Sequence, residues 1–443
     1  MRLAWAAVLP YQIVIPRWSG GPGPRLRERL GYPSEPAGVR PGGLWLHAVS
    51  VGEVRLALPL LEGLRDRLPE RSIHLTTGTA GGRALAEAAH RRGVPPGPDS
   101  LSALPFDFPG PMRRILDRLA PCAVVLLETE IWPNLLRLCG RRGTPVVLAN
   151  GRISPRSFPR YRAVRRFLRR VLADVRLFGM QSEEDAERIV GIGAPRDRVS
   201  VTGNLKFDLP VPDAESAEVR RRLGLRDRSP LFLAGSTAPG EESPVLEAYA
   251  MLRQFDPRAR LIFVPRHPED ASRAEAAFRS ARLNTARWSR TGAGSAGGPP
   301  GGATEGPAAR HQVLIVDAVG LLPELYAAAD VVFVGGSLVP RGGHNILEPA
   351  ALGKPVLFGP HVENFRSAAR TLVAAGGGFV VRDGRALGQL GVRLLSDRDV
   401  REAAASAARQ VVRANRGAMR RTLDMIQAII PPSAAGRRAP ARA

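Results

Sequence analysis

The sequence predicts an α/β protein with two Rossmann-like domains that face each other across a cleft. Two observations carry this prediction. The chain has 443 residues, about twice the length that one hydrophobic core usually supports, and 44% of them are hydrophobic. From residue 43 onward, short apolar runs alternate with amphipathic helical patterns, and the series starts again after residue 229. Apolar runs separated by helices are typical of a parallel sheet that is covered on both faces.

The first series of runs predicts a domain over residues 31–209. Strands are expected at residues 43–49, 73–77, 123–127, 145–149 and 176–180. After the first strand, the leucines at positions 56, 60, 61, 64 and 68 fall on one face of a helix, and a second helix is expected at 82–90. This alternation is the pattern of one Rossmann-like unit.

The second series predicts a domain over residues 230–430, joined to the first by a polar, charged linker at 210–229. Its strands are expected at residues 231–234, 261–264, 313–316, 331–334, 356–358 and 379–381. Residues 290–310 are rich in Gly, Ala, Pro and Ser without periodicity, which predicts a surface loop. The low-complexity residues 431–443 predict a disordered tail.

The N-terminal residues 1–30 begin with an apolar stretch that contains Pro10 and Pro16 and is followed by Arg17. The stretch is shorter than the roughly 20 apolar residues that span a bilayer, and no small-residue cleavage site follows it. We therefore expect a hydrophobic segment that associates with a membrane surface; a spanning helix and a plain soluble N-terminus are the alternatives. The two cysteines, Cys122 and Cys139, exclude a disulfide framework and lack metal-ligand spacing.

The charge balance is strongly basic, with 64 Lys and Arg against 41 Asp and Glu and a net charge of +23. Such a surplus favours nucleic acid, anionic membranes or phosphorylated substrates as partners, unless it reflects an arginine-rich genome. A nucleic-acid-binding face would gather cations with stacking aromatics, but aromatics are 5% of the chain and the arginines are scattered through both domains. No nucleic-acid partner is expected.

One local cluster of arginines stands apart from this general surplus. Eight arginines lie between Arg152 and Arg170, interleaved with apolar residues at helical spacing. This pattern predicts a basic amphipathic helix that suits a membrane surface or a phosphorylated lipid. The alternative is a solvated basic face on a helix that packs on the core.

In the first domain, candidate site residues follow the predicted strands, where the carboxyl ends of parallel strands meet at one edge. Ser50, Gly52 and Glu53 come after the first strand, and Gly52 is expected to permit a sharp turn. Glu53 then either complements a helix dipole or accepts a proton from an incoming hydroxyl. Glu128 and Glu130 leave an apolar strand, so we expect at least one to face the cleft; an ordinary helix-start acid is the alternative.

Lysine is nearly absent from the chain, which draws attention to the positions where it is kept. Lys206 is one of two lysines, and it lies beside an apolar strand end. This placement indicates that a compact ammonium group is needed there, with chance as the alternative.

In the second domain, the small-residue turn around Ser236 leads into a helix. Its backbone N–H groups and the helix dipole suit a phosphate, although Ser236 can equally be a simple N-cap. After the next strand, Arg266 and His267 suit a phosphate or a base.

The densest polar pattern comes later in the second domain. Gly336 and Ser337 end a buried strand, and a double glycine there lets the backbone approach a ligand. Asn345 and Glu348 are one helical turn apart on the same side, which suits a carboxylate on ribose hydroxyls and an amide on phosphate. A helix start with a capping asparagine is the alternative.

Taken in order, the motifs resemble one family. They are residues 47–53 (HAVSVGE), 128–134 (ETEIWPN), 152–156 (RISPR), 203–208 (GNLKFD), 235–237 (GST), 342–345 (GGHN) and 348–350 (EPA). Over roughly residues 30–430 the chain resembles the 3-deoxy-D-manno-octulosonic acid (Kdo) transferases, the lipid A glycosyltransferases of lipopolysaccharide biosynthesis. The resemblance implies a GT-B fold, CMP-Kdo as donor, a lipid A precursor (lipid IVA) as acceptor, and a place on the cytoplasmic face of the inner membrane.

The resemblance also implies roles for residues. Glu53 would be the general base of an inverting transfer, and Glu348 would hold the ribose, while Glu130 would belong to the site of the first domain. Lys206, Arg266, Asn345 and the Ser236 turn would neutralise the single phosphate of CMP without a metal or cofactor. The other expected substrate-binding residues are Ser50, Gly52, Arg152, His267, Gly336 and Ser337.

Two features depart from the family pattern: the insert at 290–310, and an N-terminal stretch that is shorter and more proline-broken than the usual anchor. Other GT-B nucleotide-sugar enzymes, such as a UDP-sugar transferase or a 2-epimerase, share the elements of the second domain. The motifs at 50–53 and 128–132 in the first domain favour Kdo transfer over these alternatives.

Overall fold

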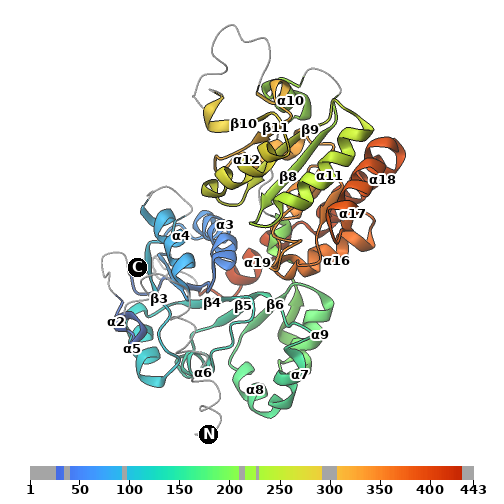
Figure 1. Ribbon diagram of the computed structural model, residues 1–443. Coiled ribbons are helices and arrows are strands. Elements are labelled where there is room, and N and C mark those ends of the chain that lie inside the picture. Colours follow the sequence, from blue (N-terminus) through green and yellow to red (C-terminus); the bar gives the residue numbers. More distant parts are fainter. Residues whose placement is uncertain are drawn as a thin grey trace, which may run out of the picture. The chain divides into compact units, whose positions relative to one another are not determined.

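The computed structural model describes residues 26–33, 40–91, 97–208, 215–225, 229–291 and 307–431. The chain divides into two units (Figure 1): unit 1 comprises Met1–Leu209 and Arg416–Ala443, and unit 2 comprises Pro210–Asn415. Among the described residues, each unit contains a seven-stranded sheet in which the paired strands are parallel and helices alternate with strands. The predicted α/β class with two Rossmann-like domains is confirmed.

The sheet of unit 1 has the strand order β3-β2-β1-β4-β5-β6-β7. Its strands are β1 (Leu44–His47), β2 (Ile73–Thr77), β3 (Ser100–Ala103), β4 (Ala123–Leu127), β5 (Val146–Gly151), β6 (Leu177–Met180) and β7 (Val199–Val201). The order reverses between β1 and β4, and ligands of open α/β sheets bind at such a switch point, beyond the carboxyl ends of the strands.

Helices cover both faces of this sheet. They are α2 (Leu26–Arg29), α3 (Val51–Arg67), α4 (Ala80–Arg91), α5 (Pro109–Leu119), α6 (Pro133–Arg142), α7 (Phe158–Ala163), α8 (Arg165–Leu172), α9 (Glu183–Gly191) and α19 (Ala418–Gln427). Along β1, Leu44 and Leu46 belong to the hydrophobic cluster with α3, whereas Trp45 belongs to the cluster with α5 and α6. Both faces of the strand are therefore buried, which explains its continuous apolar run.

The C-terminal helix α19 lies outside the domain to which the sequence assigned it. The second domain was expected to extend to residue 430, but α19 belongs to unit 1. Ile426 of α19 is fully buried in the same cluster as Leu60 of α3, and Figure 1 shows the two helices side by side. An amphipathic pattern indicates that a helix packs on a core but does not indicate which core, so the packing of α19 on unit 1 could not be predicted from its pattern.

The sheet of unit 2 repeats the same plan in the order β10-β11-β9-β8-β12-β13-β14. Its strands are β8 (Leu231–Thr237), β9 (Arg260–Pro265), β10 (Thr285–Arg287), β11 (Val313–Ile315), β12 (Val331–Val334), β13 (Val356–Phe358) and β14 (Gly378–Val380). The switch point lies between β8 and β12.

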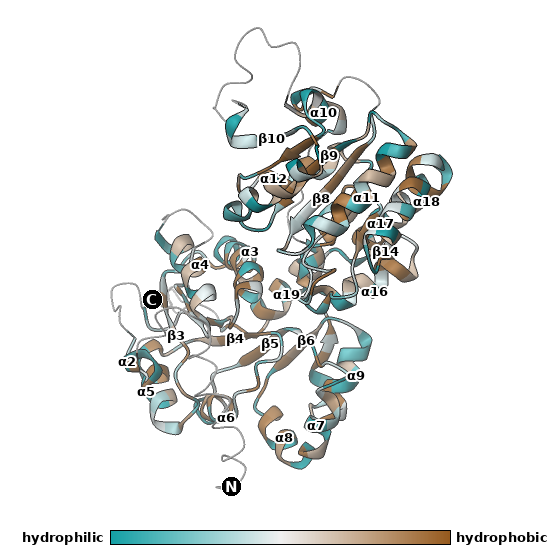
Figure 2. Cartoon of the chain, viewed as in Figure 1, coloured by the Kyte–Doolittle hydropathy of each residue, from teal (hydrophilic) through white to brown (hydrophobic). Residues whose placement is uncertain are grey.

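Unit 2 also has helices around a buried sheet. They are α10 (Ser216–Arg222), α11 (Glu242–Phe255), α12 (Ala271–Ser280), α13 (Pro307–Arg310), α14 (Leu322–Ala328), α15 (Leu347–Ala351), α16 (Arg366–Ala374), α17 (Gly384–Ser396) and α18 (Arg398–Asn415). Phe232, Phe263 and Phe333 on neighbouring strands are buried in one cluster. Strands such as β4 and β9 are brown in Figure 2, whereas the helices carry both teal and brown residues.

Part of the expected linker, residues 210–229, is folded into unit 2. Helix α10 lies within it, and Val219 and Leu223 are buried. Arg220 donates hydrogen bonds to the Ala328 carbonyl (2.9 Å) and Asp330 (3.3 Å), which ties α10 to the end of α14. Residues 1–25, 292–306 and 432–443, which hold most of the expected membrane segment, insert and tail, lie outside the described residues. Within the described ranges, no helix is long and apolar enough to cross a membrane.

Candidate functional site

The switch point of unit 1 places Glu53 at the start of α3. Ser50 is the N-cap of this helix, and its hydroxyl oxygen accepts the Glu53 N–H at 3.4 Å. In return, Glu53 Oε1 accepts the Ser50 hydroxyl at 2.9 Å and Oε2 accepts the Val49 N–H at 2.8 Å. These bonds fix the direction of a carboxylate that is 8% exposed.

Gly52 lies inside the first turn of α3, and the expectation that it permits a sharp turn is wrong. Its φ is not in the left-handed region, and a Cβ added there would meet only the Ser50 hydroxyl oxygen, at 3.8 Å. Gly52 is exposed and places no side chain beside Glu53.

Burial raises the pKa of Glu53 to about 7, with a further rise from the negative charge of Glu128. The Val49 N–H and His47 oppose this shift, and Glu130 adds to it. A carboxyl group with a pKa near the working pH is suited to accept a proton in a reaction. The raised pKa is compatible with the interpretation of Glu53 as a proton acceptor, and its contacts with Ser50 and Val49 also place it in the helix start.

Glu130 and His47 form a second pair at this edge. His47 Nε2 lies 3.7 Å from Glu130 Oε2, and its Nδ1 lies 2.9 Å from the Thr76 hydroxyl oxygen. His47 is completely buried, and Nε2 has no hydrogen-bond partner among the described residues. In the sequence, His47 is only the first residue of the motif at 47–53; its place at the carboxyl end of a predicted strand was the signal that could have marked it as a site residue.

Lys206 reaches the same edge from a short 3₁₀ turn, Leu205–Asp208. The buried Asn150, at the end of β5, holds this turn by accepting the Leu205 N–H on Oδ1 at 3.0 Å. Burial lowers the pKa of Lys206, while Glu128 and Glu53 raise it, so the ammonium group is in electrostatic contact with both carboxylates. Asn150, which has a left-handed φ of 54°, was missed because nothing in its local sequence points to Leu205.

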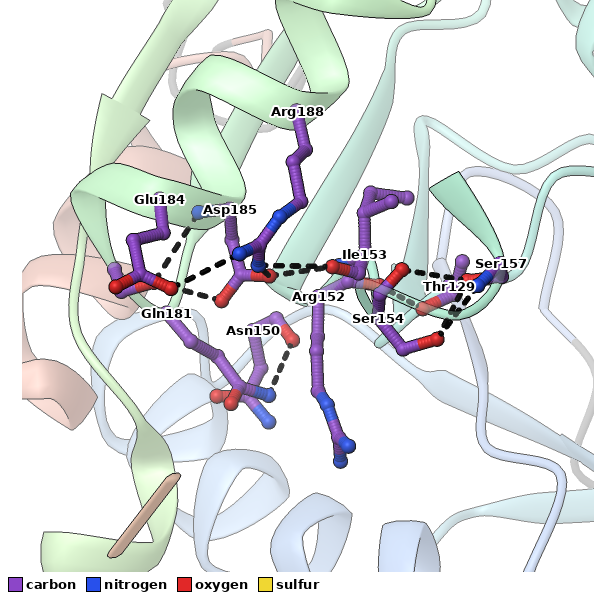
Figure 3. Close-up of polar contacts among 11 residues, drawn as sticks. Thr129, Asn150, Arg152, Ile153, Ser154, Ser157, Gln181, Glu184, Asp185 and Arg188 are labelled. Atoms are coloured by element: carbon purple, nitrogen blue, oxygen red, sulfur yellow. Dashed lines mark hydrogen bonds and ion pairs between the residues drawn. The ribbon is translucent and has the colours of Figure 1, made fainter. Parts of the chain in front are cut away.

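The loop that carries Arg152 is held from two sides (Figure 3). Its carbonyl accepts a hydrogen bond from the Thr129 hydroxyl, and the next residue, Ile153, donates its N–H to Asp185 at 2.9 Å. Arg188 of α9 donates to the Ile153 carbonyl at 3.2 Å. The Arg152 side chain extends away from this network in Figure 3, so the network fixes the backbone and leaves the guanidinium group to contact other partners.

In unit 2, the turn after β8 is held by internal carboxylates. Glu241 accepts the Ala238 N–H at 2.8 Å, and Glu242 accepts the Gly240 N–H at 2.8 Å. These two N–H groups are therefore not available to a phosphate. Ser236 has a left-handed φ of 53° and is not the N-cap of α11, a position that Glu241 occupies.

Gly336 and Ser337, after β12, are also committed to internal contacts. The Ser337 hydroxyl donates to the Val334 carbonyl at 2.6 Å and accepts the Gly359 N–H at 2.8 Å. Gly336 has a left-handed φ of 66°, and a Cβ there would lie 2.7 Å from His344. Glycine is needed at this position to let the loop fold closely against His344.

Asn345 and Glu348 lie on the same side of the chain, as predicted. Asn345 Nδ2 donates to Glu348 Oε1 at 2.9 Å, and Asn345 Oδ1 accepts the Leu347 N–H at 3.1 Å. Arg266 and His267 follow β9, and the Arg266 N–H bonds the carbonyl of Thr237 at the end of β8. Arg266 and His267 thus lie in the loop after β9, Asn345 lies in the segment between β12 and α15, and Glu348 lies in the first turn of α15. The described ranges contain no group of three or more His, Cys, Asp or Glu side chains that could hold a metal.

Comparison with known proteins identifies the family. Residues 24–209 match the family model of 3-deoxy-D-manno-octulosonic-acid transferase (kdotransferase). The 3-deoxy-D-manno-octulosonic acid transferase of Bordetella pertussis is 39% identical over 388 residues, which cover 87% of this chain and 86% of that protein. The chain belongs to the Kdo transferase family. The 3-deoxy-D-manno-octulosonic acid transferase of Haemophilus influenzae is 34% identical over 91% of both chains.

Among solved structures, the UDP-GlcNAc 2-epimerase of Neisseria meningitidis has a TM-score of 0.57 and covers 87% of this Kdo transferase and 100% of its own chain. At 14% identity this likeness shows the fold alone, which is the GT-B fold. Sequence identity separates this chain from the epimerases, because the relatives at 34–39% identity are Kdo transferases.

Proposed function

We propose that this Kdo transferase moves Kdo from CMP-Kdo to a lipid A precursor, lipid IVA, and inverts the anomeric configuration. The observation that carries the proposal is Glu53, a buried carboxyl group with a pKa of about 7 at the switch point of unit 1. CMP as the carrier and lipid IVA as the acceptor rest on the resemblance of the ordered motifs.

In the proposed reaction, Glu53 takes the proton of an acceptor hydroxyl as its oxygen forms a bond to the anomeric carbon of Kdo. The bond from that carbon to the phosphate oxygen of CMP breaks, and CMP leaves with the electron pair. Lys206 offsets the negative charge of the reacting groups, and Glu130 and Arg152 contribute to acceptor binding, with Ser50 and Gly52 beside them. No metal or cofactor takes part.

Unit 2 is proposed to bind the CMP part of the donor. Glu348 holds the ribose, and Asn345 donates a hydrogen bond to the Glu348 carboxylate. Arg266 supplies a cation for the phosphate, and His267 follows it in the same loop. The remaining proposed donor-site residues shape the loops that end β8 and β12: Ser236, Gly336 and Ser337.

The experiment that tests this function is mass spectrometry of the products formed from lipid IVA and CMP-Kdo. We expect lipid IVA to gain the mass of one or more Kdo units. Calorimetric titration with CMP and UDP is the second arm. Binding of UDP with no binding of CMP, together with no product from CMP-Kdo, would reassign the chain to a UDP-sugar enzyme.

A membrane partner is proposed on a different surface, the α7–α8 cluster, which comprises residues 158–172. Val164 is 49% and Phe167 is 43% exposed among exposed arginines, while Leu168 packs into the core of unit 1. Exposed apolar side chains within a basic surface suit the headgroup region of an anionic bilayer. The proposal places the enzyme on the anionic, cytoplasmic face of the inner membrane.

Vesicle co-sedimentation tests this surface. Replacing four arginines of the cluster with Gln is expected to weaken binding to vesicles that contain anionic lipid by at least about tenfold, since each cation near such a surface contributes about 1 kcal/mol. The four are Arg162, Arg165, Arg166 and Arg169. The matched control removes the same charge from exposed arginines elsewhere: Arg113, Arg118, Arg382 and Arg385. Equal losses in both variants would mean that net charge, rather than this cluster, drives binding.

A further inference from the structure

Unit 2 contains a buried carboxylate that the proposed reaction does not use. Glu241 lies between the turn after β8 and the start of α11, and its exposed fraction is 0%. A buried carboxylate is strongly unfavourable unless hydrogen bonds replace the water that it has lost. The hydrogen-bond donors that replace this water therefore indicate the structural role of Glu241.

Backbone N–H groups supply the replacement. Glu241 Oε2 accepts the N–H of Ala238 at 2.8 Å and that of Gly336 at 2.7 Å. Oε1 accepts the N–H of Ser337 at 3.0 Å and that of Leu338 at 2.9 Å. A carboxylate has about four lone-pair sites, so these bonds, counted among the described residues, occupy both oxygens. Bonds from N–H to an ionised acceptor are also stronger than neutral ones.

The donors belong to two loops that are far apart in the sequence. Ala238 lies in the loop after β8, and Gly336 to Leu338 form the loop after β12. Strands β8 and β12 are neighbours at the switch point of unit 2, where ligands of such sheets bind. The carboxylate therefore joins the two loops that border the ligand position.

The surrounding backbone is built around this carboxylate. At Gly335, an added Cβ would lie 2.5 Å from Glu241 Oε2 and 2.5 Å from the Thr237 Cα, so only glycine fits between the loops. The N–H groups that meet a ligand phosphate in many Rossmann-like units meet an internal anion here.

We propose that Glu241 is the positioning residue that fixes both ligand-binding loops of unit 2 before the nucleotide arrives. The proposal rests on nucleotide binding by unit 2, as stated in the proposed function. Because the loops are already fixed, nucleotide binding does not have to order them, which favours affinity. Glu241 itself touches neither the nucleotide nor the reacting atoms.

The test uses the full chain with E241Q, which keeps the size of the side chain. The glutamine amide presents N–H groups to N–H donors, so we expect the loops to separate and the calorimetric Kd of CMP to rise by at least about tenfold. In the transfer assay, the KM for CMP-Kdo should rise while the KM for the lipid acceptor stays unchanged. E241D keeps the charge and should recover part of the CMP affinity. If E241Q does not fold, E241D replaces it in every comparison.

The control is L394A, a cavity variant of the same unit. Leu394 is fully buried on α17, and Gly391, one turn earlier, packs on Leu252 near the end of α11, away from Glu241 at its start. L394A should lose thermal stability yet keep wild-type CMP affinity below its unfolding range. Wild-type affinity in E241Q, or an equal loss of affinity in L394A, would overturn the proposal.

The same titrations are run with UDP. If the wild-type chain binds UDP and ignores CMP, the proposed function fails, and the Glu241 proposal is then judged by the UDP affinities of the three variants. The two failures are therefore distinguishable.

Discussion

The two switch points of the molecule carry a glutamate in corresponding places and surround it differently. Glu53 follows β1 in unit 1, and Glu241 follows β8 in unit 2; each strand is the first of its unit and borders the point where the strand order reverses. Within the described part of the chain, Glu53 accepts one backbone N–H and one hydroxyl, whereas Glu241 accepts four N–H groups.

The difference teaches that topology sets where the carboxylate lies and the donors around it set what it can do. Glu241 has both oxygens fully occupied, so it is committed to joining two loops. Glu53 keeps acceptor capacity open and lies near two other carboxylates, which contribute to its raised pKa. The same strand plan thus carries the proposed proton acceptor in unit 1 and the proposed positioning residue in unit 2.

The largest expected effect comes from removing the acceptor capacity of Glu53. E53Q keeps the shape of the helix start but cannot take a proton, so kcat for transfer from CMP-Kdo should fall by about 10²–10⁴-fold. The CMP affinity measured by calorimetry should stay unchanged. E62Q, which neutralises an exposed acid on the same helix, is the control and should retain wild-type activity.

Near wild-type transfer by E53Q would contradict the difference in role between Glu53 and Glu241, because both glutamates would then be structural. Loss of CMP affinity in E53Q would also contradict it, by showing that Glu53 acts on the donor. Loss of kcat alone keeps the two roles separate.

The two lysines of the chain extend the comparison to cations. Lys206 lies in electrostatic contact with Glu53 and Glu128, whereas Lys354 Nζ donates to the Ala329 carbonyl at 2.8 Å after α14. K206M should lower kcat/KM by at least about tenfold, because one charge-assisted interaction contributes roughly 1.5–3 kcal/mol. K354M should keep wild-type kcat/KM and lose about 1 kcal/mol of stability. Equal activity losses would contradict the division between a site lysine and a structural one.

Much of the fold and part of the candidate site could be predicted from the sequence, and the parts that could not be predicted were missed for physical reasons. Apolar runs located the central strands of both sheets, but β3 and β7 are short and carry serines, so their pattern is weak. Glu53 was identified because it directly follows a predicted strand, and the structure shows that its contacts are local, within four residues. Glu241 was not identified because three of its donors lie 95–97 residues away. A local sequence pattern indicates only contacts between residues that are close in the chain. Contacts between distant residues, such as those of Glu241, form only when the strands assemble into the sheet.

The charges around Glu53 predict a smaller, pH-dependent effect. The ionised carboxylate is the active form, so kcat/KM should rise with pH through about 7. Glu128 and Glu130 both disfavour that form, and Glu128 does so more strongly. E128Q should therefore shift the rising limb of the pH profile of kcat/KM toward acid pH, and E130Q should shift it less.

Pre-steady-state or kcat/KM profiles between about pH 5 and 9 measure these shifts, with E62Q as the control that leaves the limb in place. A limb that moves toward alkaline pH in E128Q would contradict the assignment of the limb to Glu53. If the rising limb of kcat/KM lies at the same pH in all variants, a group other than Glu53 controls it.

The smallest expected effect concerns stability alone and again separates the two lysines. Burial lowers the pKa of Lys354 to about 8, with Asp330 opposing and Arg220 and Arg409 adding to the shift. Between this value and the ordinary value of 10.5, the unfolded chain binds more protons than the folded one, so stability should rise with pH across that window. The free energy of unfolding of wild type relative to K354M should increase by about 1–2 kcal/mol between the two pH limits, as urea titrations can measure. Identical pH slopes in both proteins would show that the surroundings of Lys354 compensate its charge, so that its pKa stays near the ordinary value. Both lysines of the chain would then lie at sites that hold a charged ammonium group.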